Sequence, residues 1–375
     1  MDAFIQPQIS LIEYGIPYRG PFNGIKYLTT AWVSKLKYIN EDGEIDEYTR
    51  ISAGKKSTRR FILGDIEYTG SYGIVERVTC YESSIDDNGQ IMHGQEVLYR
   101  KKSRNRESLL CEACFQIASR QLLKKYGCED IISEVKDIVC FNDDSIGFTM
   151  VPFNNMSFLS AVIDNMTEED IVACIGHITL IIWILADELG INHRDLKGNN
   201  ILIGLKTLYN KSPSPIFGSI NSTENKITSS RKKMSIKYKD FLIEIAPHPS
   251  VHFVDFGFAC CGTGKDTEIS ATNYFPSTDP CPKQGRDIFQ LLTHIYLTIY
   301  NRNAKIVKYI EELLELPGRD YPAFLRMHGD KSIDWVYFLL GSSNFTAPKC
   351  EPYNILKVLS EKYPYIIKLE GQNTI

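Results

Sequence analysis

The pattern of hydrophobic and polar positions predicts a strand-rich section over residues 61–153. Four short stretches there combine apolar and β-branched residues as strands do. They are Ile74–Tyr81, Glu96–Lys102, Ile138–Phe141 and Ile146–Phe153. Glu107–Tyr126 instead has apolar residues at helical spacing and is followed by Gly127, which predicts one helix that stops at this glycine.

A helical section follows, over residues 157–190. Thr167-Glu-Glu-Asp170 resembles a capping box. The stretch after it is apolar nearly all round, so we expect a buried core helix that ends at Gly190. Its longest near-apolar run, Ile178–Ala186, has nine residues, whereas a helix that crosses a bilayer needs about 20. The pattern therefore predicts no membrane span.

The segments outside these two sections are less regular. Trp32–Ile39 and Ile45–Ile51 are expected to form a hairpin around the turn-rich Asn40–Glu44. Residues 205–236 are rich in Ser, Lys, Asn and Thr, which predicts a flexible surface insertion. Two further strands are expected after it, Ile236–Ile245 and Val251–Val254.

Length and composition narrow the class of protein. A chain of 375 residues is expected to form two to three domains or one large two-lobed fold. The formal net charge of −4 gives no basic field, so nucleic acid is not an expected partner. The N-terminus has no basic-then-apolar signal pattern, which predicts an intracellular protein whose ten cysteines are reduced thiols.

Two polar motifs carry the candidate chemistry. His193-Arg-Asp-Leu-Lys-Gly-Asn-Asn200 follows the buried helix and precedes a short strand, and Asp255-Phe-Gly257 follows directly after a strand that ends at Val254. In this order and context they resemble the catalytic loop and the metal-binding turn of the eukaryotic-type protein kinases. The resemblance covers about residues 61–375.

The resemblance implies a role for each polar residue of the two motifs. Asp195 would accept the proton of the attacking hydroxyl, and Lys197 would lie beside the transferring phosphate of ATP. Asn200 and Asp255 would supply oxygen ligands to Mg²⁺, a hard cation that prefers them. Arg194 could receive a phosphate from the activation segment.

A glycine-rich loop is present in an incomplete form. The kinase pattern is G-x-G-x-x-G-x-V, and Tyr68-Thr-Gly70-Ser-Tyr-Gly73-Ile-Val75 keeps the second and third glycines and the valine. By resemblance, Gly70 and Gly73 would let backbone N–H groups approach the phosphates, and Val75 would cover the adenine. Tyr68 replaces the first glycine, and an ordinary hairpin turn is the competing interpretation.

The strand lysine of the kinase family has three candidates. Val97-Leu-Tyr-Arg-Lys-Lys102 offers Arg100, Lys101 and Lys102. Lys101 is favoured because lysine is the usual point-charge phosphate binder, although Arg100 fits the strand register better unless a bulge shifts it. The helix partner is expected to be Glu112, with Glu107 as the second choice.

The connection between the two lobes is placed by spacing. Met150 ends a strand, and Val151-Pro-Phe153 would link the lobes. Because Pro152 has no backbone donor, Val151 and Phe153 would make the backbone contacts with adenine. Asp287 is expected to begin the long helix that supports the catalytic loop.

The fold class implied is α+β, a protein-kinase-like two-lobed fold with a β-rich N-lobe and a mainly helical C-lobe. The expected boundaries are an N-terminal extension at 1–60, the N-lobe at 61–153 and the C-lobe at 154–375. The implied function is ATP- and Mg²⁺-dependent phosphorylation of Ser and Thr in protein substrates. A small-molecule phosphotransferase of the same fold and an ATP-binding pseudokinase scaffold are the alternatives. The damaged glycine loop and the long insertion are similar to divergent kinases of large DNA viruses.

Overall fold

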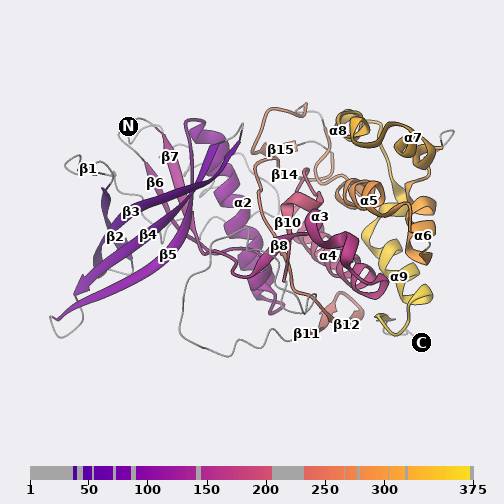
Figure 1. The fold of residues 1–375 in the computed structure, drawn as a ribbon, viewed down its shortest axis with the longest axis horizontal. Helices are drawn as coiled ribbons and strands as arrows, with labels where there is room; N and C mark the ends of the chain where they lie inside the picture. Colours follow the sequence, from indigo (N-terminus) through magenta and orange to yellow (C-terminus); the bar gives the residue numbers. More distant parts are fainter. Residues whose placement is uncertain are drawn as a thin grey trace. The chain divides into compact units, whose positions relative to one another are not determined.

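The structure is a computed structural model, and its chain divides into two compact units. The first contains Met1–Phe153 with two short later segments, Phe256–Ala259 and Ile269–Asn273, and the second contains the rest. The described residues are 37–39, 45–52, 55–70, 73–85, 90–140, 145–204, 232–265, 267–276, 279–302, 304–316 and 320–371. Their architecture is α+β, with the sheet-rich part first and most helices in the later part (Figure 1).

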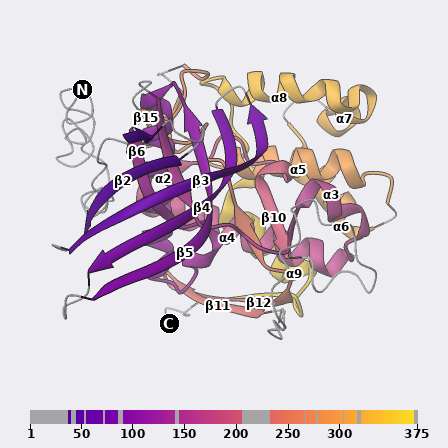
Figure 2. The same ribbon diagram turned by 60° about the vertical axis from the view of Figure 1, so that its left-hand side comes forward.

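The first unit is built on one seven-stranded antiparallel sheet of order β1-β2-β3-β4-β5-β7-β6. A cluster of buried side chains, among them Phe61, Val78 and Leu98, lies on β3, β4 and β5. These long central strands lie side by side in the sheet (Figure 2). The strands are β1 (Lys37–Ile39), β2 (Ile45–Ser52), β3 (Lys55–Gly70), β4 (Gly73–Ile85), β5 (Ile91–Ser103), β6 (Val135–Cys140) and β7 (Ile146–Met150).

One long helix, α2 (Arg106–Lys124), packs against β5, β6 and β7 of this sheet. It begins where the side chain of Asn105 accepts a hydrogen bond from the N–H of Ser108, which satisfies one of the otherwise unpaired first-turn donors. Its apolar residues, including Leu110 and Phe115, are buried. The predicted helix is therefore present, and it ends before the expected Gly127.

The second unit contains the remaining helices around one central helix, α4 (Glu168–Leu189). It also has three small sheets of order β13-β10-β8, β11-β12-β16 and β15-β14-β9. Its strands are β8 (Met156–Phe158), β9 (Ile191–Asn192), β10 (Ile201–Gly204), β11 (Lys232–Tyr238), β12 (Phe241–His248), β13 (Val251–Phe253), β14 (Cys260–Gly262), β15 (Thr267–Ser270) and β16 (Ile367–Gly371). The other helices are α3 (Leu159–Val162), α5 (Arg286–Ile299), α6 (Lys305–Leu314), α7 (Tyr321–His328), α8 (Ser332–Gly341) and α9 (Pro352–Lys362).

Helix α4 begins and ends where the sequence predicts. The Thr167 hydroxyl accepts from the N–H of Asp170, and Gly190 adopts φ 65°, a left-handed conformation that suits glycine. The helix is long and apolar enough to cross a membrane, but 94% of its apolar window is buried within the structure. That burial is the arrangement of a core helix, consistent with the absence of a membrane span.

Two expectations for the first half of the chain are changed by the structure. The boundary at residue 60 falls inside β3, and β1 and β2 continue the same sheet, so the described part of the N-terminal extension belongs to the first unit. The hairpin of β1 and β2 is present with Ile39 opposite Ile45, while Trp32–Leu36 and the turn at 40–44 lie outside the described residues.

The expected insertion and the strands after it also differ. Residues 205–231 lie outside the described residues, but 232–236 begin strand β11. The single strand expected over Ile236–Ile245 is a hairpin, because Lys239 adopts φ 51° and reverses the chain between β11 and β12. Strand β12 also pairs with the last strand, β16, which is a long-range contact that the sequence pattern does not reveal.

The prediction that all cysteines are reduced is wrong for one pair. Cys260 on β14 and Cys281 form a disulfide, with their Cα atoms 6.3 Å apart. Strand β14 pairs with β9, and the N–H of Gly264 donates to the carbonyl of Cys281, so the two chain segments meet although they are separated by 21 residues. Seven cysteines are free thiols among the described side chains.

Candidate active site

Asn200 and Asp255, one from each polar motif, meet in the second unit because β10 and β13 are antiparallel neighbours. Ile201 lies opposite Phe253, so the residues just before β10 adjoin the residues just after β13. The N–H of Val254 donates to the carbonyl of Asn200 at 3.1 Å. Asn200 and Asp255, 55 positions apart in the sequence, are thereby brought to the same end of this strand pair.

The carboxylate of Asp195 is held by its own loop. The amide nitrogen of Asn200 donates to Oδ2 of Asp195 at 2.7 Å and to its backbone carbonyl at 2.8 Å. Lys197 places Nζ 3.0 Å from the same Oδ2. Asp195 is only 3% exposed, so these charge-assisted contacts keep a buried carboxylate in one orientation.

The buried carboxylate of Asp287 fixes the backbone of this loop through hydrogen bonds. It lies in the first turn of α5 and accepts from the N–H groups of His193 at 2.8 Å and Arg194 at 2.9 Å. Nε2 of His193 in turn lies 3.1 Å from the carbonyl of Val254. The expected contact between Asp287 and the loop at 193–200 is thus present.

Two residues of the candidate site have an unusual backbone conformation. Arg194 and Asp255 both adopt φ 63°, the left-handed region that non-glycine residues rarely occupy. Such strain persists only where surrounding contacts impose it, and it concentrates at functional sites. Here it turns the chain sharply at one residue in each polar motif.

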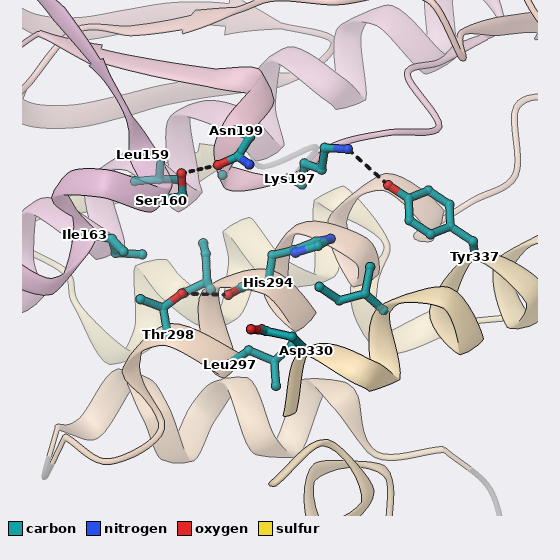
Figure 3. A pocket seen from close by; sticks show the side chains of 13 residues that line it. Leu159, Ser160, Ile163, Lys197, Asn199, His294, Leu297, Thr298, Asp330 and Tyr337 are labelled. Carbon is teal, nitrogen blue, oxygen red and sulfur yellow. Dashed lines mark hydrogen bonds between the residues drawn. The ribbon is translucent and has the colours of Figure 1, made fainter. Parts of the chain in front are cut away.

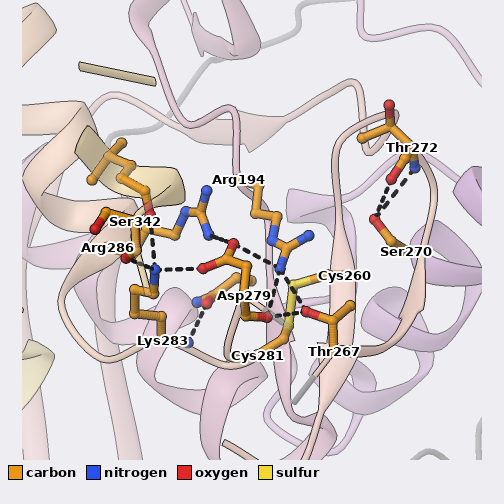
Figure 4. A network of polar contacts seen from close by, with 12 residues as sticks. Arg194, Cys260, Thr267, Ser270, Thr272, Asp279, Cys281, Lys283, Arg286 and Ser342 are labelled. Atoms are coloured by element: carbon orange, nitrogen blue, oxygen red, sulfur yellow. Dashed lines mark hydrogen bonds and ion pairs between the residues drawn. A yellow bond between two sulfur atoms is a disulfide. The ribbon is translucent and has the colours of Figure 1, made fainter. Parts of the chain in front are cut away.

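Arg194 belongs to a fully buried network of charges (Figure 4). Its guanidinium lies 3.0 Å from the carboxylate of Asp279, which also pairs with Arg286 and Lys283. Arg194 donates to the hydroxyl of Thr267 at 2.8 Å as well. Burial, and then the nearby charge of Arg286, lower the pKa of Arg194 to about 10. An internal carboxylate therefore occupies the place at which a phosphate from the activation segment was expected.

One further residue at this site, Tyr337 on α8, has no signal in the sequence. Its hydroxyl donates to Oδ1 of Asp195, and Nζ of Lys197 lies 3.5 Å from the same hydroxyl. Burial, followed by the charge and hydrogen bond of Asp195, raises the pKa of Tyr337. The contact spans 142 positions, and Tyr337 lies in an aromatic stretch that resembles ordinary core, so no local pattern identifies it.

A cavity of about 340 Å³ lies beside Lys197 and Tyr337 (Figure 3). Its wall is formed by α3, the loop at residues 197–199, α5, and α8 with the segment before it. His294 lines it, and its Nε2 is buried with no hydrogen-bond partner among the described residues. Burial, and then the charge of Lys197, lower the pKa of His294 to about 4. A neutral imidazole therefore adjoins the charged lysine.

Lys101, the favoured candidate for the strand lysine, has an acidic partner on the helix of the first unit. Nζ of Lys101 lies 2.6 Å from Oε1 of Glu112 on α2, and both side chains are buried. Arg100 points to the opposite face and pairs with Glu76 at 2.7 Å. The register of β4 and β5 is continuous here, so no bulge is needed to bring Lys101 and Glu112 together.

Strands β3 and β4, which contain the two glycines, pair with Gly70 opposite Gly73, while Ser71 and Tyr72 lie outside the described residues. Gly73 adopts φ 146°, and a Cβ there would lie 2.6 Å from the carbonyl oxygen of Lys102. The close approach of β5 alone therefore requires this glycine. Val75 lies directly opposite Lys101 in the register and shares its face of the sheet.

The connecting segment differs in one detail from the expectation. The N–H of Val151 donates to the carbonyl of Glu134 at 3.0 Å, and the carbonyl of Val151 accepts from the Ser133 hydroxyl at 2.6 Å. Val151 therefore has no backbone donor to offer a nucleotide and could contribute only as an acceptor. Phe153 is the last residue of the first unit's main segment.

The residues expected to bind Mg²⁺ have a suitable donor set. The amide nitrogen of Asn200 donates to Asp195, so the amide oxygen is the atom of this side chain that could bind a cation, and Asp255 is an exposed acidic residue. Among the described residues no cluster of three or more His, Cys, Asp or Glu could hold a metal. Two protein oxygens nevertheless fit Mg²⁺, which usually completes its coordination with phosphates and water.

Comparison with known proteins adds no relationship to this geometry. Neither the scan against protein-family models nor the search of curated proteins finds a match to the chain. The function must therefore be argued from the residues themselves.

Proposed function

We propose that the chain is a protein kinase of divergent, kinase-like two-lobed fold that transfers the γ-phosphate of ATP to Ser and Thr hydroxyls of protein substrates. The observation that carries the proposal is the set of contacts on Asp195. Asn200 and Lys197 hold its carboxylate, and Asp287 holds the backbone on which it stands. Phosphoryl transfer requires this kind of positioned base and cation.

Each group in the set has a chemical task in the transfer. Asp195 orients the acceptor hydroxyl and takes its proton, while Lys197 offers positive charge to the transferring phosphoryl group. Mg²⁺, which Asn200 and Asp255 would hold, would neutralise charge on the phosphates when bound. In the first unit, Lys101 would contact the nucleotide phosphates, with Glu112 keeping its ammonium in place.

The test is transfer of radiolabelled γ-phosphate from ATP with Mg²⁺ to casein, a generic acceptor protein. We compare the wild type with Asp195→Asn, a variant that keeps the shape and loses the base. We expect the variant to be slower by at least about 100-fold, the usual contribution of a general base. Equal rates for the two proteins, with no gain in rate when Tyr337 is replaced by Phe, would refute the proposal. Phosphoamino-acid analysis of the product then separates Ser and Thr from Tyr.

One observation favours a second candidate, an ATP-binding pseudokinase. Asp195 is 3% exposed and already accepts a hydrogen bond from Tyr337, so a substrate hydroxyl meets an occupied carboxylate. A pseudokinase would show a thermal shift with Mg-ATP and no transfer to casein or to small hydroxyl acceptors. Transfer to a small acceptor alone would identify a small-molecule phosphotransferase.

A further inference from the structure

The hydroxyl of Tyr337 lies where an acceptor hydroxyl would have to bind. It donates to Oδ1 of Asp195 and lies 3.5 Å from Nζ of Lys197. The other carboxylate oxygen of Asp195 is used by Asn200 and Lys197. A substrate hydroxyl that approached Asp195 would therefore compete with Tyr337 for Oδ1, the oxygen that the loop itself leaves open.

We propose that Tyr337 is an internal substitute for the acceptor hydroxyl, and that α8 must withdraw it before a substrate is phosphorylated. This inference rests on the proposed function and adds to it a mode of regulation. Tyr337 is then neither a catalytic base nor a nucleophile. It controls the access of acceptors to Asp195.

The position of α8 is linked to the same loop by a second route. Nζ of Lys283 donates to the carbonyls of Leu340 at 2.8 Å and Ser342 at 2.9 Å, at the C-terminal end of α8. A cation is favourable there because it meets the negative end of the helix dipole. Lys283 also pairs with Asp279, which pairs with Arg194, the neighbour of Asp195 (Figure 4). The charge network thus holds both the base and the helix that covers it.

The contact also reaches the segment after the second polar motif. The ring of Tyr337 meets that of Tyr274 edge to face, with centroids 6.2 Å apart, and Tyr274 is 57% exposed. Few residues of α8 are buried, with Ser332, Val336 and Leu340 the ones that are. A helix held by so little core is suited to local displacement. A bound protein substrate could reach Tyr274 first and move Tyr337 through it.

The experiment compares four proteins by steady-state transfer to casein: the wild type, Tyr337→Phe, Tyr365→Phe and Asp195→Ala. Tyr337→Phe keeps the ring and removes only the competing hydroxyl. Tyr365 is 81% exposed, so its variant is the matched control. We expect Tyr337→Phe to raise kcat/KM for casein roughly tenfold or more, which is the scale of one lost hydrogen bond to a charged group. The KM of Tyr337→Phe for ATP should equal that of the wild type. The transfer rate of Tyr365→Phe should also equal that of the wild type.

The outcomes separate this inference from the function on which it rests. If neither the wild type nor Tyr337→Phe is faster than Asp195→Ala, the proposed function and this inference are both refuted. If the wild type exceeds Asp195→Ala and Tyr337→Phe is unchanged or slower, only the inference fails, and Tyr337 is then a positioning residue or a bystander. Phosphotyrosine at position 337 in the wild type would also overturn it, since Tyr337 would then be a substrate. A silent wild type with an active Tyr337→Phe, abolished again by Asp195→Ala, would support both proposals.

Discussion

Lys101 of strand β5 and Glu112 of helix α2 form a buried ion pair, with 2.6 Å between Nζ and Oε1. Lys101 is 8% exposed and Glu112 is 3% exposed. Two charges are removed from water here, which is costly unless each satisfies the other. The pair therefore fixes the ammonium position relative to the sheet.

The first prediction concerns this lysine. Lys101→Met should reduce phosphoryl transfer on the order of 100-fold, because the cation that we propose contacts the nucleotide phosphates is lost. Lys102→Met, the adjacent alternative from the sequence, should stay within about threefold of the wild type. Radiolabelled transfer measures both, with far-UV circular dichroism to verify folding. Equal losses in the two variants would show that the Glu112 partner does not identify the functional lysine.

The second prediction concerns the contacts between Asp287 and the loop at 193–200. Asp287→Ala leaves the N–H groups of His193 and Arg194 buried without their acceptor, at a cost of about 1–3 kcal/mol each. We expect a lower Tm and a strongly reduced transfer rate, while binding of Mg-ATP by titration calorimetry is kept. Loss of nucleotide binding in a folded variant would contradict the local role of Asp287.

The third prediction concerns the buried charge network. Asp279→Asn removes the carboxylate that three cations share, so we expect the free energy of unfolding to fall by about 3–5 kcal/mol. Asp164→Asn is the control, because Asp164 is exposed where it pairs with Arg302, and its loss should cost less than about 1 kcal/mol. Urea unfolding measures both. If Asp279→Asn lowers the free energy of unfolding as little as Asp164→Asn does, the three cations move to contact solvent when the carboxylate is lost.

The fourth prediction concerns acid stability. His177 is buried on α4 with Nδ1 2.8 Å from Nε2 of His248, and His252 is also near. Burial, and then these two histidines, lower the pKa of His177 well below 6.5. The unfolded chain therefore binds a proton below pH 6.5 that the folded chain does not, and stability should fall as the pH drops below that value. The slope for one group is up to about 1.4 kcal/mol per pH unit.

Urea unfolding between about pH 7 and 5 tests this, with His177→Gln as the variant. The wild type should lose stability more steeply than the variant over this range. His328→Gln, at an exposed position on α7, is the control and should follow the wild type. A variant as steep as the wild type would place the acid sensitivity in other groups.

The fifth prediction concerns the disulfide. Thiol titration in denaturant should detect two fewer thiols before reduction than after it, for the bond between Cys260 and Cys281. A link across 21 residues is worth about 3 kcal/mol, so reductant should lower the stability of the wild type by about that amount. The double variant Cys260→Ala, Cys281→Ala should not respond to reductant. Equal thiol counts in both conditions would show that the pair is reduced.

Local sequence patterns predicted the parts of this molecule that local chemistry determines. The cap at Thr167 and the stop at Gly190 depend on adjacent residues, and the structure has both. The neighbourhood of Asp195 and Asn200 was predictable because both lie in one short loop. Lys101 and Arg100 lie on opposite faces of β5. The alternation of side chains along the strand does not show which of these faces meets Glu112.

The unpredicted parts depend on contacts between distant segments. Tyr337 reaches Asp195 across 142 positions, and nothing near position 337 in the sequence encodes this. Asp279 was overlooked because its burial depends on Arg194 and Arg286 converging from two other elements. The Cys260–Cys281 bond likewise depends on the approach of two segments 21 positions apart, which also meet where the N–H of Gly264 donates to the carbonyl of Cys281.

The apolar surface of α4 has a consequence for biosynthesis. The partners that cover this helix, β12, α9 and β16, all follow it in the chain, and β16 ends about 180 residues after α4 does. At ribosomal rates of about 5–20 residues per second, roughly 10–35 s pass between the synthesis of α4 and the synthesis of β16, its last partner. During that time a nascent chain displays a segment as apolar as a membrane helix. We expect recombinant yield to depend on chaperone supply and growth temperature more than on the stability of the finished protein.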